Sequence, residues 1–172
     1  MVSTARPLDL IVQRSTLELL EAIGVPAAPR LAGPSQAPMS GQFAGLVRFS
    51  APAFRGALSL TVPTKILART VRASANEATL LDWLRELTNQ LMGRLKNKLV
   101  RYQLLVRVAA STSGSAATME TQFRPIKGSE RVYMFRTMTD DVVVRLRGEL
   151  DDKALVFSST AEVIDEGDVI LF

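Results

Sequence analysis

The chain has 172 residues, a formal net charge of +4, and neither cysteine nor histidine. Its length suits one domain, and its 47% hydrophobic and 22% charged residues are typical of a soluble globular protein. The missing histidine and cysteine exclude a Ser-His-Asp or Cys-His nucleophile and any histidine- or thiolate-ligated metal site. No apolar run approaches the ~20 residues of a membrane span, and the N-terminus lacks a signal-peptide region, so we expect no membrane contact. The absence of cysteine suits the cytoplasm, where we expect the protein to be.

The charge is unevenly distributed along the chain. Residues 150–172 carry six acids and one lysine, a net charge of −5, which leaves +9 on the remainder. A basic body can attract nucleic acid, an anionic membrane or an acidic protein, and a surface with no charged partner is an equally good interpretation. Nucleic acid is not the expected partner, because aromatic residues make up only 6% of the chain and interleave with basic ones only at Arg101-Tyr102.

The first 41 residues predict one helix and one long loop. Apolar residues recur at helical spacing over residues 8–23, where Pro7 suits the first turn and Gly24 suits the end. Four prolines and three glycines then fall within residues 24–41, a density that no regular element accommodates. We therefore predict a proline-rich loop there, followed by a core over residues 42–172, all within one domain spanning residues 1–172.

The next segment predicts a strand hairpin and a short helix. Residues 42–50 and 54–62 have the composition of strands, and the second alternates, with Leu58 and Leu60 on one face and smaller side chains on the other. A helix is predicted over residues 65–75, with Thr64 as its N-cap.

Residues 76–98 have the longest clean helical period in the chain. Five leucines at spacings of three and four define one face of this helix: Leu80, Leu84, Leu87, Leu91 and Leu95. Asn76 is placed to cap the helix, and the basic residues in its last turns complement the helix dipole. A polar line runs along a different side and contains Asp82, Glu86, Asn89, Gly93 and Lys96. We expect the leucine face to dock the helix and the polar line to be the functional surface.

After residue 100 the pattern becomes strand-like. Apolar side chains alternate over five stretches, at residues 102–108, 119–123, 132–136, 142–146 and 155–157. Turn-forming residues separate these stretches at 113–115, 127–129, 139–141 and 150–152, and residues 165–168 suggest a last hairpin turn. Because helices are grouped in the first half and strands in the second, the sequence predicts an α+β fold. We expect a largely antiparallel sheet with two or three helices packed on one face.

The polar line contains two residues that a helix does not favour. The side chain of asparagine competes for backbone hydrogen bonds, and a glycine within a helix costs about 1 kcal/mol relative to alanine. Glu86 and Asn89 are three residues apart, so their side chains lie one above the other. We interpret them as a candidate functional pair and Gly93 as clearance for an approaching surface. The alternative interpretations are a solvated helix face and tight packing of Gly93 against a neighbouring element.

These residues resemble a known pattern. Asp82, Glu86 and Asn89 have the spacing found in the active helix of the CheC/CheX/FliY family of chemotaxis phosphatases. The preceding GLVRFSAPAFRGALSLTVPTKILART is similar to the hairpin and helix of that family, and NQLMGRLKNKL is similar to its Asn-x-x-x-Gly continuation. The resemblance covers roughly residues 42–112. It departs from the family near Thr112, where a proline is expected.

The resemblance implies a CheX-like fold and hydrolysis of the aspartyl phosphate of a CheY-like response regulator. Asn89 would then orient the attacking water, Glu86 would contact a lysine of the regulator, and Asp82 and Gly93 would lie in the partner interface. The protein would need no cofactor of its own, because the regulator supplies the Mg²⁺ and the acidic pocket. An amide can hold a water in line without acting as a base, so this chemistry requires no histidine.

The chain contains a single Glu-x-x-Asn. Single-site members of the family resemble CheX, which pairs into a dimer, so the resemblance implies a homodimer. We expect it to form through an exposed sheet edge, because edge strands seek partners.

Two alternative functions stay open. The first is a non-catalytic CheX-like module that docks a response regulator or a motor-switch component. The second is nucleic-acid binding, which a steep loss of affinity with added salt would reveal.

Overall fold

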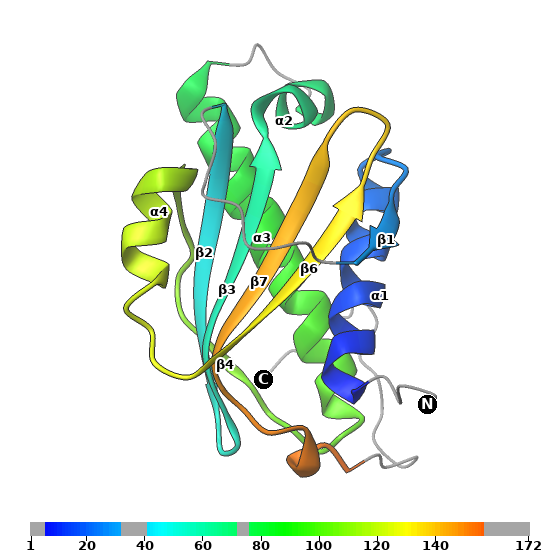
Figure 1. The fold of residues 1–172 in the computed structure, drawn as a ribbon, viewed down its shortest axis with the longest axis vertical. Helices are drawn as coiled ribbons and strands as arrows, with labels where there is room; N and C mark the ends of the chain where they lie inside the picture. The colour runs from blue at the N-terminus through cyan, green and yellow to red at the C-terminus, as the bar shows by residue number, and fades with distance from the viewer. Residues whose placement is uncertain (1–5, 32–40, 72–75, 157–172) are drawn as a thin grey trace, which may run out of the picture.

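The protein is built around one antiparallel sheet with helices on both of its faces (Figure 1). In the computed structural model, which describes residues 6–31, 41–71 and 76–156, the strand order is β1-β6-β7-β3-β2-β4, with β5 also paired to β2. Along the chain the elements are α1 (Pro7–Ala22), β1 (Ala28–Arg30), β2 (Gln42–Ala51), β3 (Phe54–Pro63), α2 (Thr64–Thr70), α3 (Glu77–Val100), β4 (Arg107–Val108), β5 (Thr112–Ser115), α4 (Ala116–Phe123), β6 (Ser129–Arg136), β7 (Asp141–Leu150) and the 3-10 helix η1 (Asp152–Ala154). Every described strand pair is antiparallel, which confirms the predicted α+β fold with its antiparallel sheet.

The centre of the sheet is the predicted hairpin together with one strand from the end of the chain. β2 and β3 pair along their whole length, and β7 inserts between β3 and β6. The strands converge at the end that carries the β2–β3 turn and fan apart at the other (Figure 1). At the narrow end Gly56 lies against Gly148, and a Cβ at Gly56 would lie 2.1 Å from the carbonyl oxygen of Arg147. Only glycine permits that approach of the two backbones.

Helices α1 and α3 cover one face of the sheet, and the main core lies beneath them (Figure 1). All five leucines of the predicted leucine face are buried, as expected. They pack against apolar side chains of β2, β3, β6 and β7 that include Val47, Leu58, Phe135 and Val144. The periodicity of the sequence therefore identified the docking face of α3 correctly.

The opposite face of the sheet carries α4, where the sequence predicts a strand at residues 119–123. That prediction is wrong, because Ala116, Met119 and Phe123 recur at spacings of three and four and form one apolar side of a helix. The hydroxyl of Ser115 caps this helix by accepting a hydrogen bond from the N–H of Thr118 at 3.2 Å. α4 packs on β2 and β3 in a small second core, so helices lie on both faces of the sheet and not on one alone.

The predicted loops contain more strand than expected. Residues 113–115, predicted as a break, belong to β5, which pairs with β2. The proline-rich loop at residues 24–41 contains β1, which pairs with β6 at one edge of the sheet. Conversely, of the predicted strand at residues 102–108 only Arg107–Val108 is paired.

Other element ends also differ from the predictions. Thr64 is not an N-cap but the first residue of α2, and its hydroxyl donates to the carbonyl of Gly41 at 2.8 Å. The described part of this helix ends at Thr70 and not at residue 75. Leu155 is buried but follows η1 and is not in a strand. Residues 72–75, Phe157 and the predicted turn at 165–168 lie outside the described residues.

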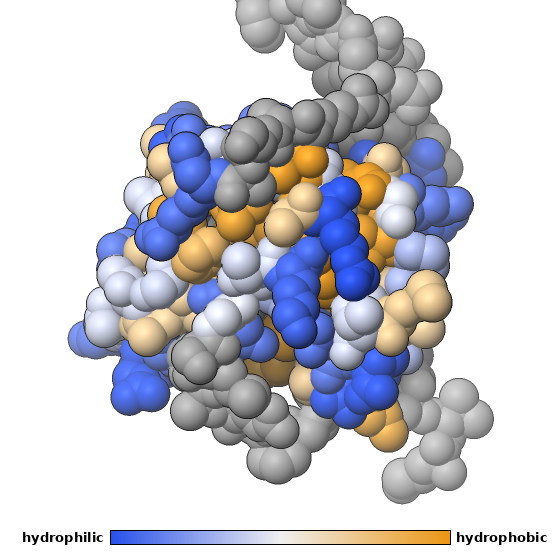
Figure 2. Space-filling view, turned by 90° about the horizontal axis from the view of Figure 1, so that it is seen from above, coloured by the Kyte–Doolittle hydropathy of each residue, from blue (hydrophilic) through white to orange (hydrophobic). Residues whose placement is uncertain are grey.

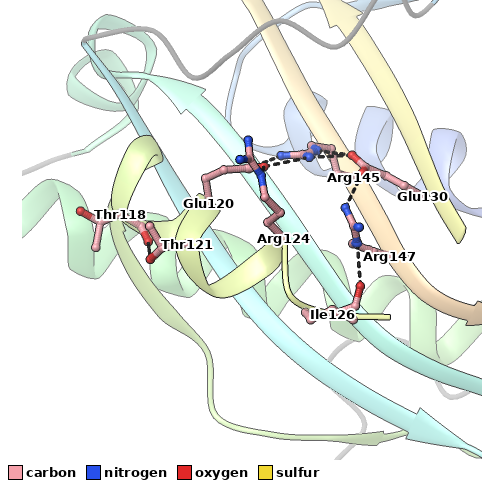
Figure 3. A network of polar contacts seen from close by, with 8 residues as sticks. All are labelled: Thr118, Glu120, Thr121, Arg124, Ile126, Glu130, Arg145 and Arg147. Atoms are coloured by element: carbon pink, nitrogen blue, oxygen red, sulfur yellow. Dashed lines mark hydrogen bonds and ion pairs between the residues drawn. The ribbon is translucent and has the colours of Figure 1, made fainter. Parts of the chain in front are cut away.

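An arginine–carboxylate network fastens α4 to the sheet (Figure 3). The guanidinium of Arg145 on β7 lies between Glu120 of α4 and Glu130 of β6, bonds to both, and is 2.6 Å from a Glu130 oxygen. It also lies 4.5 Å from the centre of the Phe123 ring. Burial opposes the charge of Arg145, but the bonds to the two carboxylates outweigh burial and raise its pKa. Arg147 extends the network with a 2.9 Å hydrogen bond to Glu130.

A second network joins α1, β6 and η1. The hydroxyl of Tyr133 donates to Asp9 at 2.6 Å, and Arg131 bonds to Asp9 at 3.1 Å and also to Asp152. The N–H of Leu8 donates to Asp152 at 3.2 Å. Burial alone would raise the pKa of Asp152, but these bonds from Arg131 and Leu8 outweigh it and lower that pKa below its ordinary value. The charged form of Asp152 is therefore part of what holds α1 and η1 to the sheet.

No helix within the described ranges has the length and apolar character needed to cross a membrane. Seen from the end of the molecule that carries α2, the surface is a mixture of hydrophilic and hydrophobic patches (Figure 2).

Candidate functional site

Helix α3 has a well-defined start and a fixed orientation. The side chain of Asn76 caps it, as predicted, by accepting a 2.9 Å hydrogen bond from the N–H of Thr79. The indole N–H of Trp83 donates to the hydroxyl of Thr70 in α2 at 2.8 Å. These contacts fix the N-terminal half of the helix, which carries the candidate residues.

The sheet holds α3 in place through small residues. A Cβ at Gly45 of β2 would lie 1.9 Å from the hydroxyl oxygen of Thr88, so the helix rests directly on the strand backbone. The hydroxyl of Ser113 donates to the carbonyl of Leu81 at 2.8 Å. The hydroxyl of Ser111 lies 3.4 Å from the carbonyl of Arg85, at the long end of hydrogen-bond distances. Sequence reasoning assigned no role to these serines, because their partners are helix carbonyls 26 or more residues away.

The predicted polar line faces outward. Asp82, Glu86 and Asn89 are offset by two residues from the leucine face, which is about 200° around the helix axis. All three side chains are exposed, whereas Leu84 and Leu87 are buried. The structure therefore brings Glu86 and Asn89 side by side on an open surface, as the spacing predicts.

Two neighbours that the sequence analysis did not single out contact the candidate acids. The side-chain amide of Gln90 donates to Glu86 at 3.0 Å, one helical turn further along. Arg85 forms a 2.8 Å salt bridge with Asp82, whose side chain is 69% exposed. Both acids are thus held by residues of the same helix and still present oxygens to solvent, because a carboxylate accepts several hydrogen bonds.

Gly93 lies on the same side of the helix as Glu86 and Asn89 and is open. A Cβ built there meets no atom within 4 Å, so tight packing against a neighbouring element does not explain the glycine. Its predicted contribution to a partner interface stays a prediction.

The basic end of α3 has a structural explanation in part. Lys98 donates to Glu18 of α1 at 2.5 Å, and Arg94 lies 3.9 Å from the same carboxylate. These charges join α3 to α1. Lys96 is exposed and belongs to the outward side.

Thr112, near which the family pattern has a proline, is the first residue of β5 and is exposed. Its hydroxyl lies 3.9 Å from the sulfur of Met119 in α4. The hydroxyl therefore faces α4, on the side of the sheet away from α3.

The arrangement suits a positioning role. Glu86 offers a carboxylate and Asn89 an amide on a rigid helix, and an amide can donate to and accept from a water at once. Within the described part of the chain no group of three or more acidic residues is placed to hold a metal ion.

The fold is that of solved chemotaxis proteins. A structure of CheX from Vibrio vulnificus is 19% identical, with a TM-score of 0.63 over 84% of this chain and 99% of that chain. The CheX–CheY–BeF3–Mg²⁺ complex from Borrelia burgdorferi is 10% identical, with a TM-score of 0.64 over 83% of this chain and 98% of that chain. The FliM middle domain from H. pylori is 11% identical, with a TM-score of 0.52 over 83% of this chain and 87% of that chain.

CheC-like and FliY structures are also among the matches. No family model and no curated protein matches the sequence. The likeness in structure confirms, at the level of the fold, the resemblance to the CheC/CheX/FliY proteins.

Proposed function

We propose that this protein is a CheX-like phosphatase that hydrolyses the aspartyl phosphate of a CheY-like response regulator. The observation that carries the proposal is the exposed pair Glu86 and Asn89 on the polar line of α3, which forms an outward stripe along the helix. The fold is shared with a CheX that was crystallised with CheY, BeF3 and Mg²⁺. The open surface at Gly93 leaves room for the regulator on the same stripe.

In this mechanism the role of Asn89 is to position the attacking water. An acyl phosphate is already activated, so its hydrolysis needs a water held in line with the bond that breaks. The carbonyl oxygen of the Asn89 amide would accept a hydrogen bond from that water while its NH₂ group faces the phosphoryl oxygens. The regulator would supply the Mg²⁺ that neutralises charge on the transferred group.

The role of Glu86 is to bind the regulator. An exposed carboxylate on the same stripe can form a charge-assisted hydrogen bond with a lysine of the regulator. Gln90 would keep the Glu86 side chain on that stripe before the regulator arrives, because it already bonds to it at 3.0 Å.

The test is the decay of a phosphorylated CheY-like regulator with and without the protein. Asn89→Ala should slow the stimulated rate about 100-fold or more, the scale of losing one positioned polar group. Glu86→Gln should mainly raise the regulator concentration needed for half-maximal rate, because the docking charge is lost. Asn97→Ala, which removes another asparagine of the same helix, is the matched control. If Asn89→Ala clears the phosphorylated regulator as fast as the wild type, the mechanism is wrong.

The second candidate is a non-catalytic module that docks a regulator or a motor-switch component. Thr112, near which the family pattern has a proline, favours it, and the FliM middle domain shares the same fold. This reading predicts a complex with the BeF3-loaded regulator and no acceleration of phosphate release. Two results together would select this candidate. Asn89→Ala would still bind the regulator, and the wild-type protein would leave the spontaneous rate of phosphate loss from the regulator unchanged.

We also propose a homodimer formed through the edge strand β1. All three residues of β1 are exposed, and within the described residues the strand has a partner only in β6. Leu31, which follows it, is 93% exposed. An unpaired edge with an apolar neighbour is suited to pairing with a second copy. Sedimentation that stays monomeric at high concentration would contradict this.

A further inference from the structure

Three arginines cluster on the sheet face that lies away from α3. Ser50 of β2 pairs with Arg55 of β3 on one side and with Arg107 of β4 on the other. Arg48 precedes Ser50 by two residues on the same strand, so all four side chains point to the same face. The three arginine side chains are exposed, and Ser50 is half-buried between them.

The register brings the three arginines within reach of one another. Arg48 lies opposite Ala57 on β3, and its carbonyl accepts a hydrogen bond from the N–H of Ala109 beyond β4. Arg48 is therefore the diagonal neighbour of both Arg55 and Arg107, and diagonal neighbours lie about 7–8 Å apart, within reach of long side chains. Three long guanidinium side chains at that spacing can converge on one anionic group above Ser50.

The positive charges of the three arginines are not offset by ion pairs within the described residues. Within the described residues none of the three forms a salt bridge or a side-chain hydrogen bond, whereas Arg145 and Arg147 on the same face are bonded to carboxylates. Glu149 pairs with Arg55 across the strands but forms no ion pair with it. Three positive charges therefore gather around Ser50 on adjacent strands, and no ion pair within the described residues accounts for them.

An apolar side chain accompanies the arginines. Burial alternates over the residues before β4: Leu104 and Val106 are buried, whereas Leu105 and Arg107 are exposed. Leu105 is 75% exposed and projects to the same side as Arg107. The surface thus combines three cations with one apolar contact.

We propose that Arg48, Arg55, Arg107 and Leu105 form a docking surface for an acidic peptide segment of a partner protein. The planar fork of arginine matches a carboxylate with two parallel hydrogen bonds, and the cluster offers three such forks. Leu105 fits an apolar side chain of the same segment. The surface lies on the face of the sheet away from Asn89, so its occupant and a regulator on α3 can bind at the same time.

The experiment measures fluorescence anisotropy of the full chain with a labelled nonapeptide of glutamate that carries leucine at every third position. Arg48→Gln, Arg55→Gln and Arg107→Gln should each weaken binding about tenfold, the scale of one charge-assisted hydrogen bond. Arg55→Lys should lie between wild type and Arg55→Gln, because it keeps the charge and loses the fork. Leu105→Ser should also weaken binding.

Arg69→Gln is the matched control. It removes an exposed arginine of α2, at the opposite end of the sheet from the β2–β3 turn (Figure 1). Its affinity should stay within about twofold of the wild type, because the lost charge lies more than a Debye length away at moderate salt. The urea midpoint of Arg48→Gln should stay close to that of the wild type, because Arg48 is exposed and its side chain forms no bond within the described residues.

Four results would overturn the proposal. One is equal affinity of the wild type and the triple Gln variant, and another is equal loss in Arg69→Gln. The third is stronger competition by inorganic phosphate or by a nine-nucleotide single strand than by unlabelled peptide. The fourth is tighter peptide binding when Glu162, Asp165, Glu166 and Asp168 are changed to their amides in the full chain, which would assign the surface to the chain's own acidic end. Regulator dephosphorylation should be unchanged in all these variants, so neither proposal depends on the other.

Discussion

The contact between α3 and β2 gives the sharpest test of how the candidate helix is held. Gly45→Ala places a Cβ 1.9 Å from the hydroxyl oxygen of Thr88 and 3.0 Å from the Thr88 Cβ. Thr88 is fully buried, and its hydroxyl donates to the carbonyl of Leu84 at 2.7 Å. To remove the clash between the new Cβ and Thr88, either the Thr88 side chain must rotate or α3 must shift by more than about 1 Å.

Both routes are costly. Rotation of Thr88 loses a buried hydrogen bond, at about 1 kcal/mol, and overpacking a core adds about 1–3 kcal/mol. We expect Gly45→Ala to lower the free energy of unfolding by about 2–4 kcal/mol. Urea denaturation followed by circular dichroism measures this directly, provided that the slope with urea is unchanged.

A second substitution isolates the contact. Thr88→Ala removes the hydroxyl oxygen, so the closest contact of a Cβ at position 45 relaxes from 1.9 Å to 3.0 Å. The double variant should then recover at least about 1 kcal/mol relative to the sum of the two single changes. Gly114→Ala is the matched control, because its added Cβ meets only the flexible end of Met119, at 3.0 Å. A Gly45→Ala protein as stable as Gly114→Ala would refute this account of how α3 is seated.

Three other outcomes are expected. Gly93→Ala should raise the free energy of unfolding by about 0.5–1 kcal/mol in urea, because the site is open and alanine favours the helix, while regulator binding, measured by anisotropy, weakens. Because the pKa of Asp152 is lowered in the folded protein, its stabilising effect is present above the unfolded value of about 3.9 and is lost as pH falls below it. Urea midpoints measured from pH 7 to pH 3 should fall for the wild type, and Asp152→Asn should lose part of that slope; an identical slope would contradict the role of Arg131 as its partner. Phe123→Ala should lower the free energy of unfolding in urea by about 3–4 kcal/mol, because it opens the small core under α4 and removes the ring beside Arg145. A decrease of less than about 1 kcal/mol would show that the packing of α4 contributes little to stability.

The elements predicted correctly are those whose pattern is long and repeats. The leucine face of α3 spans about four turns, and each strand of the β2–β3 hairpin is ten residues long. α4 is only eight residues long, and its short window reads equally well as alternation through Met119, Thr121 and Phe123. Its helical state depends on Ala44, Leu46 and Ala57, which lie far earlier in the chain and provide the surface on which it packs. No local pattern contains that information.

The candidate site shows the same division. The spacing of Glu86 and Asn89 is a property of one helix, so the sequence alone placed them on one stripe. The hydroxyl contacts of Ser111 and Ser113 with α3, and the arginine cluster around Ser50, depend on which strands become neighbours. β4 and β5 both pair with β2 at the sheet edge, and the sequence does not reveal that order.

The position of β7 has a consequence for how the chain folds. β3 lies between β2, its hairpin partner, and β7, whose paired residues are about 90 positions further along the chain. Hairpin formation takes microseconds, whereas pairing over such a separation must first close a long loop. We therefore expect the hairpin and α3, which rests on it, to associate early and the centre of the sheet to close last. In a chain still being synthesised, the helix that carries Glu86 and Asn89 would be seated before the strand that completes the sheet exists.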